Sequence, residues 1–279
     1  MMKHENNPSV AVVHLIRKKN GLKPFQAFLQ SYHQHPDPLA HDLVLIFKDF
    51  EPGEDAPYLE ILKDTHFVRF DYAGDGGLDL DPYIKVSRTL FYPYFCFLNS
   101  FSQIDCDRWL SILLSGFEQF PDAGIVGATG SWESSSETDP PFPNPHIRTN
   151  AFLIPAAIMA EVTFIDVYDK DTARAVESGV DGLSRQVKGM GKKLYLADNK
   201  GGIWAEEDWP KSGIYRSKRQ EGLLVRDNRT QAYEQGDNWT KEYLHDLAWT
   251  GKPSKANPLK RHKIRHRLRR LFEKKKPLR

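Results

Sequence analysis

Short apolar runs, each ended by polar or turn-forming residues, recur along most of the chain. Residues 10–16 and 43–47 form two such runs, and the segment between them, residues 24–32, repeats its aromatic and leucine positions at helical spacing. After a short helical segment, a third apolar run follows at residues 66–70. Strands that alternate with helices over short loops are typical of a parallel sheet.

The alternation continues to residue 227 without an internal repeat. We expect further strands at residues 94–98, 124–129, 151–154, 193–197 and 223–227, and further helices at residues 83–91, 107–120 and 170–191. Asp81 and Asp107 are suited to cap two of these helices. Gly179 and Gly182 each lower helix propensity by about 1 kcal/mol, which predicts a break near Gly179. The pattern predicts an α/β fold with a mostly parallel central sheet flanked by helices.

The aromatic run at residues 94–98 stops abruptly on small polar residues. Asn99, Ser100 and Ser102 would emerge at the C-terminal edge of this buried strand, and ligands bind at that edge in open α/β sheets. The run at residues 124–129 also ends on small polar residues. Two buried strands aimed at one rim predict a binding site, although ordinary core strands with polar turns give the same pattern.

An acidic, glycine-rich segment, residues 71–81, follows the third strand. Asp71, Asp75 and Asp79 stand where side chains at the strand ends would accept hydrogen bonds from a ribose or a base. A capped loop is the simpler alternative. A calcium loop fits poorly, because the acidic ligands do not alternate and no terminal Glu follows.

The net charge of +2 hides two opposite parts of the chain. Residues 252–279 hold seven Lys and six Arg against one Glu, a net charge of +12, so residues 1–251 carry −10.

Cys96 and Cys106 are too few for a disulfide framework, which favours a reducing, cytoplasmic setting. No apolar run approaches the ~18 residues of a transmembrane helix, and the first residues lack the apolar core of a signal peptide.

Apolar residues recur at helical spacing within the basic tail, at Ile264, Leu268, Leu271 and Phe272. This spacing predicts an amphipathic helix at residues 259–276 that binds an anionic membrane surface, with the protein peripheral at the inner face of the membrane. A solvated tail is the alternative. Nucleic acid is disfavoured as a partner, because the body is acidic and the tail offers a single aromatic side chain for stacking on a base.

Three stretches carry a resemblance to a known family. The runs VAVVHLI and LVLIF open the chain, YFCFLNS follows, and ESGVDGLSRQVKGMGKKLYLAD begins at Glu177. In this order they resemble the GT-A glycosyltransferases, and most of all the family 2 group that builds bacterial surface polysaccharides, over roughly residues 10–230. The resemblance implies a GT-A, Rossmann-like fold for residues 1–250, with residues 251–279 as a basic amphipathic tail.

The resemblance implies transfer of a hexosyl or deoxyhexosyl group from a nucleoside-diphosphate sugar to a saccharide or lipid-linked acceptor. YFCFLNS stands where such enzymes place a strand ending in Asp-x-Asp, whose carboxylates hold Mg²⁺ or Mn²⁺. Residues 99–102 supply no carboxylate, so we expect weak metal affinity unless another acid substitutes. The family's Glu-Asp pair is reduced to Glu177-Ser178, which leaves Glu177 as the expected general base.

The expected site residues fall into two groups. For the donor we expect Asp71, Asp75, Asp79, Asn99, Ser100, Ser102 and Arg185; for the acceptor we expect Trp132, Glu133, His146, Arg148, Asn150 and Trp209. The charge on the leaving diphosphate is assigned to Arg148, Arg185 or Arg216 and to backbone N–H groups. Each tryptophan fits a core position as well as a sugar platform, and His146 fits a structural role better than a catalytic one.

Two other functions stay open. A GT-A-like domain that binds without catalysing is consistent with the missing Asp-x-Asp. A nucleotidyltransferase shares the early strand-helix-strand half, but it usually carries a glycine-rich basic loop after the first strand. Residues 17–21 hold only one glycine, so this function fits less well.

Overall fold

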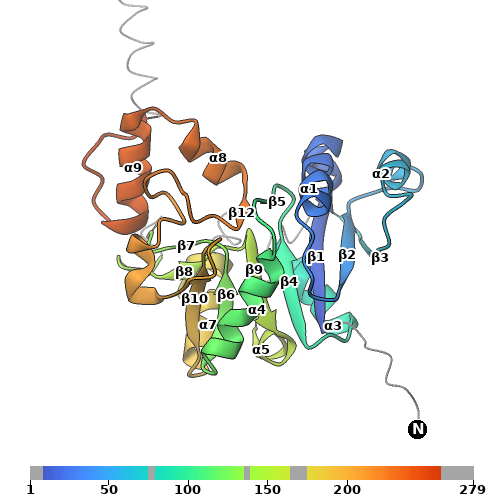
Figure 1. The fold of residues 1–279 in the computed structure, drawn as a ribbon, viewed down its shortest axis with the longest axis horizontal. Helices are drawn as coiled ribbons and strands as arrows, with labels where there is room; N and C mark the ends of the chain where they lie inside the picture. The colour runs from blue at the N-terminus through green and yellow to red at the C-terminus, as the bar shows by residue number, and fades with distance from the viewer. Residues whose placement is uncertain (1–8, 75–78, 135–138, 164–174, 259–279) are drawn as a thin grey trace, which may run out of the picture.

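The computed structural model of the protein describes residues 9–74, 79–134, 139–163 and 175–258. Its centre is an eight-stranded sheet in the order β11-β10-β6-β9-β4-β1-β2-β3 (Figure 1). The strands are β1 (Val10–Arg17), β2 (His41–Lys48), β3 (Val68–Tyr72), β4 (Tyr94–Leu98), β6 (Ala123–Gly127), β9 (Ala151–Pro155), β10 (Lys193–Ala197) and β11 (Ile203–Ala205). Six of them run in one direction, and β9 and β11 run antiparallel to their neighbours. This arrangement confirms the predicted mostly parallel sheet.

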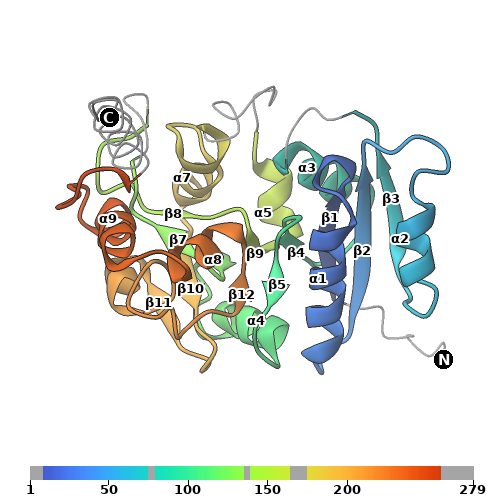
Figure 2. The same ribbon diagram turned by 90° about the horizontal axis from the view of Figure 1, so that it is seen from above.

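Helices cover both faces of the sheet (Figure 2). One layer contains α1 (Leu22–Gln34), α2 (Ala56–Ile61) and α4 (Trp109–Gln119), and the other contains α3 (Leu80–Thr89), α5 (Ala156–Glu161) and α7 (Leu183–Gly189). Along β1, Val13 and Leu15 pack toward α3, whereas Val12 and Ile16 pack toward α1. Because both faces are covered, the strands are continuous apolar runs, and for that reason the sequence pattern located them.

Two short strand pairs and two helices complete the described chain. β5 (Gln103–Ile104) pairs with β12 (Val225–Arg226), and β7 (Gly130–Ser131) pairs with β8 (His146–Ile147); α8 (Asn228–Glu234) and α9 (Asn238–Trp249) come last. The predicted break near Gly179 is confirmed, because residues 175–178 and α7 are separate helical segments. No helix in the described ranges has the length and apolarity needed to cross a bilayer. The expected tail helix at residues 259–276 lies outside the described residues.

Both predicted helix caps are wrong. The helix expected after Asp81 begins earlier, at Leu80, and the Asp81 carboxylate instead accepts a hydrogen bond from the Tyr72 hydroxyl. α4 begins at Trp109, and Asp107 binds His35 rather than the helix.

The first turn of α4 is capped by a distant residue. The carboxylate of Asp37 accepts hydrogen bonds from the backbone N–H groups of Leu110 (2.8 Å) and Ser111 (3.0 Å). These N–H groups have no partner inside the helix, so an outside carboxylate stabilises them as a local cap would. A cap that comes from this far along the chain has no local sequence signal.

One polar side chain is enclosed in the core under α1. His14 on β1 has no exposed surface, and its ring stacks on Phe28 with the centroids 3.6 Å apart. Neither ring nitrogen has a hydrogen-bond partner within the described structure. Burial lowers the pKa of His14 to about 3, so the folded protein holds the neutral imidazole.

His14 therefore makes stability depend on pH. Between the ordinary pKa of 6.5 and the folded value of about 3, the unfolded chain binds a proton that the folded chain does not. Stability from this group falls as the pH drops through that window, by up to about 1.4 kcal/mol per pH unit. We expect His14→Leu to gain stability relative to the wild type by this amount per unit below about pH 6, measured by urea unfolding. A difference between the two proteins that stays constant with pH would contradict the assignment.

Candidate functional site

The parallel strands bring their C-terminal ends to one edge of the sheet. Arg17 and Lys48, the last residues of β1 and β2, are paired in register, so their side chains lie on the same face. The alternation along both strands places them on the face covered by α3, because Leu15 and Ile46 pack there. The edge of β1 and β2 therefore carries two cations on one face.

Glu177 reaches this edge from the other half of the fold. Its Oε1 accepts hydrogen bonds from the backbone N–H of Thr149 (2.9 Å) and from the Thr149 hydroxyl (3.3 Å). The neighbouring carbonyl of Asn150 accepts the N–H of Asn99 (2.9 Å) and the Ser102 hydroxyl (2.7 Å). Glu177 thus lies beside the end of β4, where the sequence led us to expect an acidic side chain.

Asp79, at the start of α3, belongs to the same group of charges. Burial raises the pKa of Asp79, the positive charges of Lys48 and Arg17 oppose the rise, and the negative charge of Glu177 adds to it. These effects place Lys48, Arg17 and Glu177 each within electrostatic reach of Asp79. We call these four residues the rim cluster.

Lys48 and Arg17 are not among the site residues expected from the sequence. Lys48 is fully buried, with its ammonium 5.2 Å from the centre of the Tyr72 ring. A buried lysine is rare unless it is paired, so its position at the end of an apolar strand was a usable signal. We read the charged residues after both strands as turn residues instead.

The end of β4 is a closed turn. The side-chain oxygen of Asn99 accepts the N–H of Phe101 (2.9 Å) and the Ser102 hydroxyl (3.1 Å), and Ser102 is fully buried. Ser100 is also buried, and its hydroxyl has no partner within the described structure. Asn99 and Ser102 therefore hold the loop in shape, which leaves their proposed contacts with the donor without support from the geometry.

A divalent cation does not fit this turn. Mg²⁺ and Mn²⁺ prefer carboxylate oxygens, and the turn offers amide and hydroxyl groups that already bind each other. Within the described ranges, no group of three or more His, Cys, Asp or Glu side chains is arranged to hold a metal ion. The weak metal affinity expected from the sequence stays a prediction.

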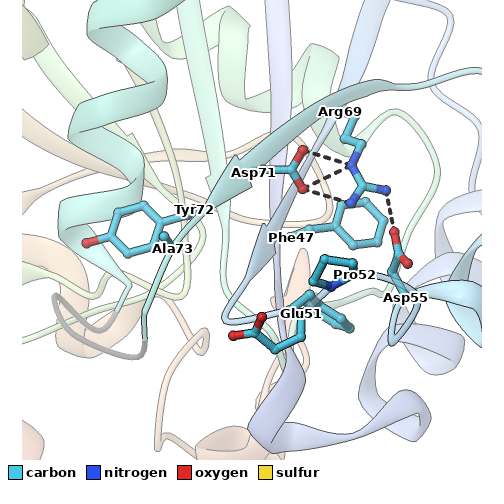
Figure 3. Close-up of a pocket in the computed structure, with 10 residues that line it drawn as sticks. Phe47, Glu51, Pro52, Asp55, Arg69, Asp71, Tyr72 and Ala73 are labelled. Atoms are coloured by element: carbon cyan, nitrogen blue, oxygen red, sulfur yellow. Dashed lines mark hydrogen bonds and ion pairs between the residues drawn. The ribbon is translucent and has the colours of Figure 1, made fainter.

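Asp71 lies on the opposite face of the sheet from the rim cluster. Its carboxylate binds Arg69 (2.8 Å) in a surface pocket of about 290 Å³ beside Phe47 and Pro52, whereas Tyr72 points the other way (Figure 3). The structure therefore does not bring Asp71 together with Glu177. Asp75, the second expected acid, lies outside the described residues.

The arginines expected at the diphosphate have other positions. Arg148 and Arg216 are buried and form ion pairs with Asp227 (2.7 Å) and Glu133 (2.8 Å). Arg185 is exposed on α7, and none of the described residues links its side chain to the rim cluster. The charges of Arg148 and Arg216 are thus balanced inside the protein.

Most of the expected acceptor residues are internal. Trp209 has no exposed surface, and its indole N–H donates to the Trp204 carbonyl (3.1 Å), which favours a core role over a sugar platform. Trp132 is half-buried and packs edge-on against Trp249. His146 and Asn150 are buried as well. Burial therefore favours structural roles for Trp209, His146 and Asn150.

By sequence, the chain matches no protein-family model and no curated protein. By structure, it is similar to a Pyrobaculum calidifontis mannosyltransferase, PcManGT, in complex with GDP-Man and Mn²⁺, with a TM-score of 0.50 and 10% identity over 75% of this chain and 61% of that chain. It is also similar to S. aureus TarS 1–349 (TM-score 0.47, 11% identity, 72% of this chain, 61% of that chain) and to GalNAc-T7 with UDP, GalNAc and Mn²⁺ (TM-score 0.48, 13% identity, 68% of this chain, 41% of that chain).

The mannosyltransferase match shows that this chain has the GT-A fold. The chain covers about three fifths or less of each of these structures, 61%, 61% and 41%. The fold agrees with the one that the motif order implied, whereas 10% identity carries no residue roles across.

The turn after β4 offers amide and hydroxyl groups instead of carboxylates, which predicts that Mn²⁺ stabilises the fold only weakly. We expect Mn²⁺ alone, at about 1 mM, to leave the thermal unfolding midpoint within about 1 °C of its value in EDTA, because an ion that does not bind the folded state cannot stabilise it. Differential scanning fluorimetry measures this directly. A saturating rise of several degrees would show that carboxylates assemble into a metal site.

Proposed function

We propose that the protein is a glycosyltransferase that moves a sugar from a nucleoside-diphosphate sugar to an acceptor hydroxyl. The observation that supports this most is the place of Glu177, hydrogen-bonded to Thr149 beside the end of β4 in a GT-A sheet. Ligands of open α/β sheets bind at this edge. The Glu177 carboxylate and the two cations of the rim cluster suit a reaction that removes a proton and releases an anion.

In this proposal Glu177 is the general base. Thr149 holds Oε1, and within the described structure no hydrogen bond involves Oε2, which leaves one oxygen for an acceptor hydroxyl. A carboxylate placed in this way takes the hydroxyl proton as the bond to the sugar forms, which accelerates transfer by about 10²–10⁴-fold.

The leaving diphosphate gains negative charge as its bond to the sugar breaks. We assign its stabilisation to Arg17 and Lys48, which share one face of the strand edge, instead of the arginines expected from the sequence. Lys48 stands on a buried strand and so is preorganised. Asp79 remains our candidate acceptor of hydrogen bonds from the ribose or base.

The acceptor and the setting follow from the basic tail. The cationic segment at residues 259–276 would hold the enzyme at an anionic membrane, within reach of a lipid-linked saccharide. We therefore propose a peripheral enzyme of surface polysaccharide synthesis that transfers a hexosyl or deoxyhexosyl group.

Replacement of Glu177 by Gln tests the base. Gln keeps an oxygen for Thr149 but cannot take a proton, so we expect transfer to fall by about 10²-fold or more while the fold is retained. Product formation is measured with a panel of UDP, GDP and dTDP sugars and extracted membranes as acceptor. Turnover that persists within a few-fold would refute the assignment.

Replacement of Lys48 by Met tests the diphosphate site. We expect the dissociation constants of the probes UDP and GDP to rise by about 10–100-fold, because a charge-assisted contact is lost. Calorimetric titration in EDTA gives the values. Lys63→Met, which removes an exposed lysine from a surface pair with Glu60, is the matched control and should change neither. Equal affinity in Lys48→Met and the control would exclude Lys48 from the site.

A binding subunit without activity is the second candidate. The absence of a carboxylate from residues 99–102 favours it, because the usual metal-assisted route is missing. Such a protein would bind a nucleotide sugar in calorimetry but release no nucleoside diphosphate, with or without acceptor. Release of nucleoside diphosphate that depends on Glu177 would exclude this candidate.

A further inference from the structure

A buried ion pair joins the C-terminal segment to the rim. Nη2 of Arg148 lies 2.7 Å from Oδ2 of Asp227, and the two residues are 7% and 0% exposed. The guanidinium also donates to the Thr129 hydroxyl (3.3 Å) and lies 4.5 Å from the centre of the Tyr215 ring. Two charges taken out of water need such partners, and loss of one leaves the other without compensation.

Asp227 is fixed by its own helix. Its Oδ1 accepts the backbone N–H groups of Arg229 (3.0 Å) and Thr230 (2.8 Å), so it is the N-cap of α8, while Oδ2 faces Arg148. Burial opposes ionisation, yet Arg148 and the bonds from Thr230 hold the pKa of Asp227 below its usual value. The carboxylate is therefore a charged and rigid anchor.

Two carboxylates act on the charge of Arg148, of which Asp227 is in direct contact. Burial acts against its charge, but Asp227 and, more weakly, Glu177 keep the pKa of Arg148 above its usual value. Arg148 is also followed directly by Thr149, whose N–H and hydroxyl hold Oε1 of Glu177. The same short stretch thus carries a buried cation and the donor groups that orient Glu177.

We propose that Asp227 is a positioning residue for transfer, because it keeps Arg148 from pairing with Glu177. With Asp227 neutralised, the buried guanidinium would turn to Glu177, the carboxylate held by the adjacent Thr149. Glu177 would then leave Thr149 and lose the oxygen that receives the acceptor proton. This inference rests on the proposed role of Glu177 as general base.

The Asp227→Asn variant tests the inference. Asn is also a good N-cap, so α8 keeps its first turn. We expect kcat to fall by about 10–100-fold while the dissociation constant of the UDP or GDP probe stays within about twofold. Asp237→Asn is the matched control, because Asp237 caps α9 through the N–H of Thr240 (2.8 Å) and is far along the chain from the rim. A parallel loss of probe affinity and kcat, or an unchanged kcat, would overturn the proposal.

The Arg148→Met/Asp227→Asn double variant distinguishes a positioning role of Asp227 from a role in fold stability alone. Removal of the cation frees Glu177 again, and replacement of both members of a buried pair is tolerated better than loss of one. We expect the double variant to turn over faster than Asp227→Asn alone. A double variant that is equally slow or slower would mean that the pair only stabilises the fold.

A third measurement does not depend on catalysis. Hydrogen exchange at the Thr149 amide, followed by NMR, should accelerate in Asp227→Asn and return toward the wild-type rate in the double variant, because the amide loses and regains its bond to Glu177. Unchanged exchange in Asp227→Asn would overturn the proposal. If this pattern appears but the wild type transfers no sugar, the positioning holds and the glycosyltransferase function fails.

Discussion

The rim depends on one backbone hydrogen bond, from the Asn99 N–H to the Asn150 carbonyl at 2.9 Å. This bond extends the antiparallel pairing of β4 and β9 one step beyond the strands, whose last pair is Leu98 with Ala151. It brings the end of a parallel strand and the start of an antiparallel strand to the same place. Thr149 then lies beside the C-terminal end of β4, and its N–H and hydroxyl hold Glu177 there.

The second constraint is the balance of buried charge. Arg148 and Arg216 each have a carboxylate partner inside the protein, Asp227 and Glu133. Removal of a charge from water is costly unless the charge is paired. These two ion pairs therefore make the buried arginines part of the stable interior. Arg17 and Lys48 stand on neighbouring strands at the strand edge, within electrostatic reach of Asp79.

The sequence located the strands because their signals are local. A strand covered on both faces must be apolar throughout, and such runs stand out over five to eight residues. The break at Gly179, which places Glu177 at the end of its helical segment, follows from the low helix propensity of glycine. The caps failed for the opposite reason, because α4 takes its cap from Asp37, which is 73 residues before Leu110.

The amino-acid sequence by itself determined the α/β class and the order of the strands along the chain, since both depend on neighbours within one element. Only the tertiary structure decided which polar groups face one another. Asp71 and Tyr72 are adjacent, yet the two-residue period of a strand sends them to opposite faces. Likewise, the pairing of Arg148 with Asp227 and of β1 with β2 is set by long-range packing, which no local pattern encodes.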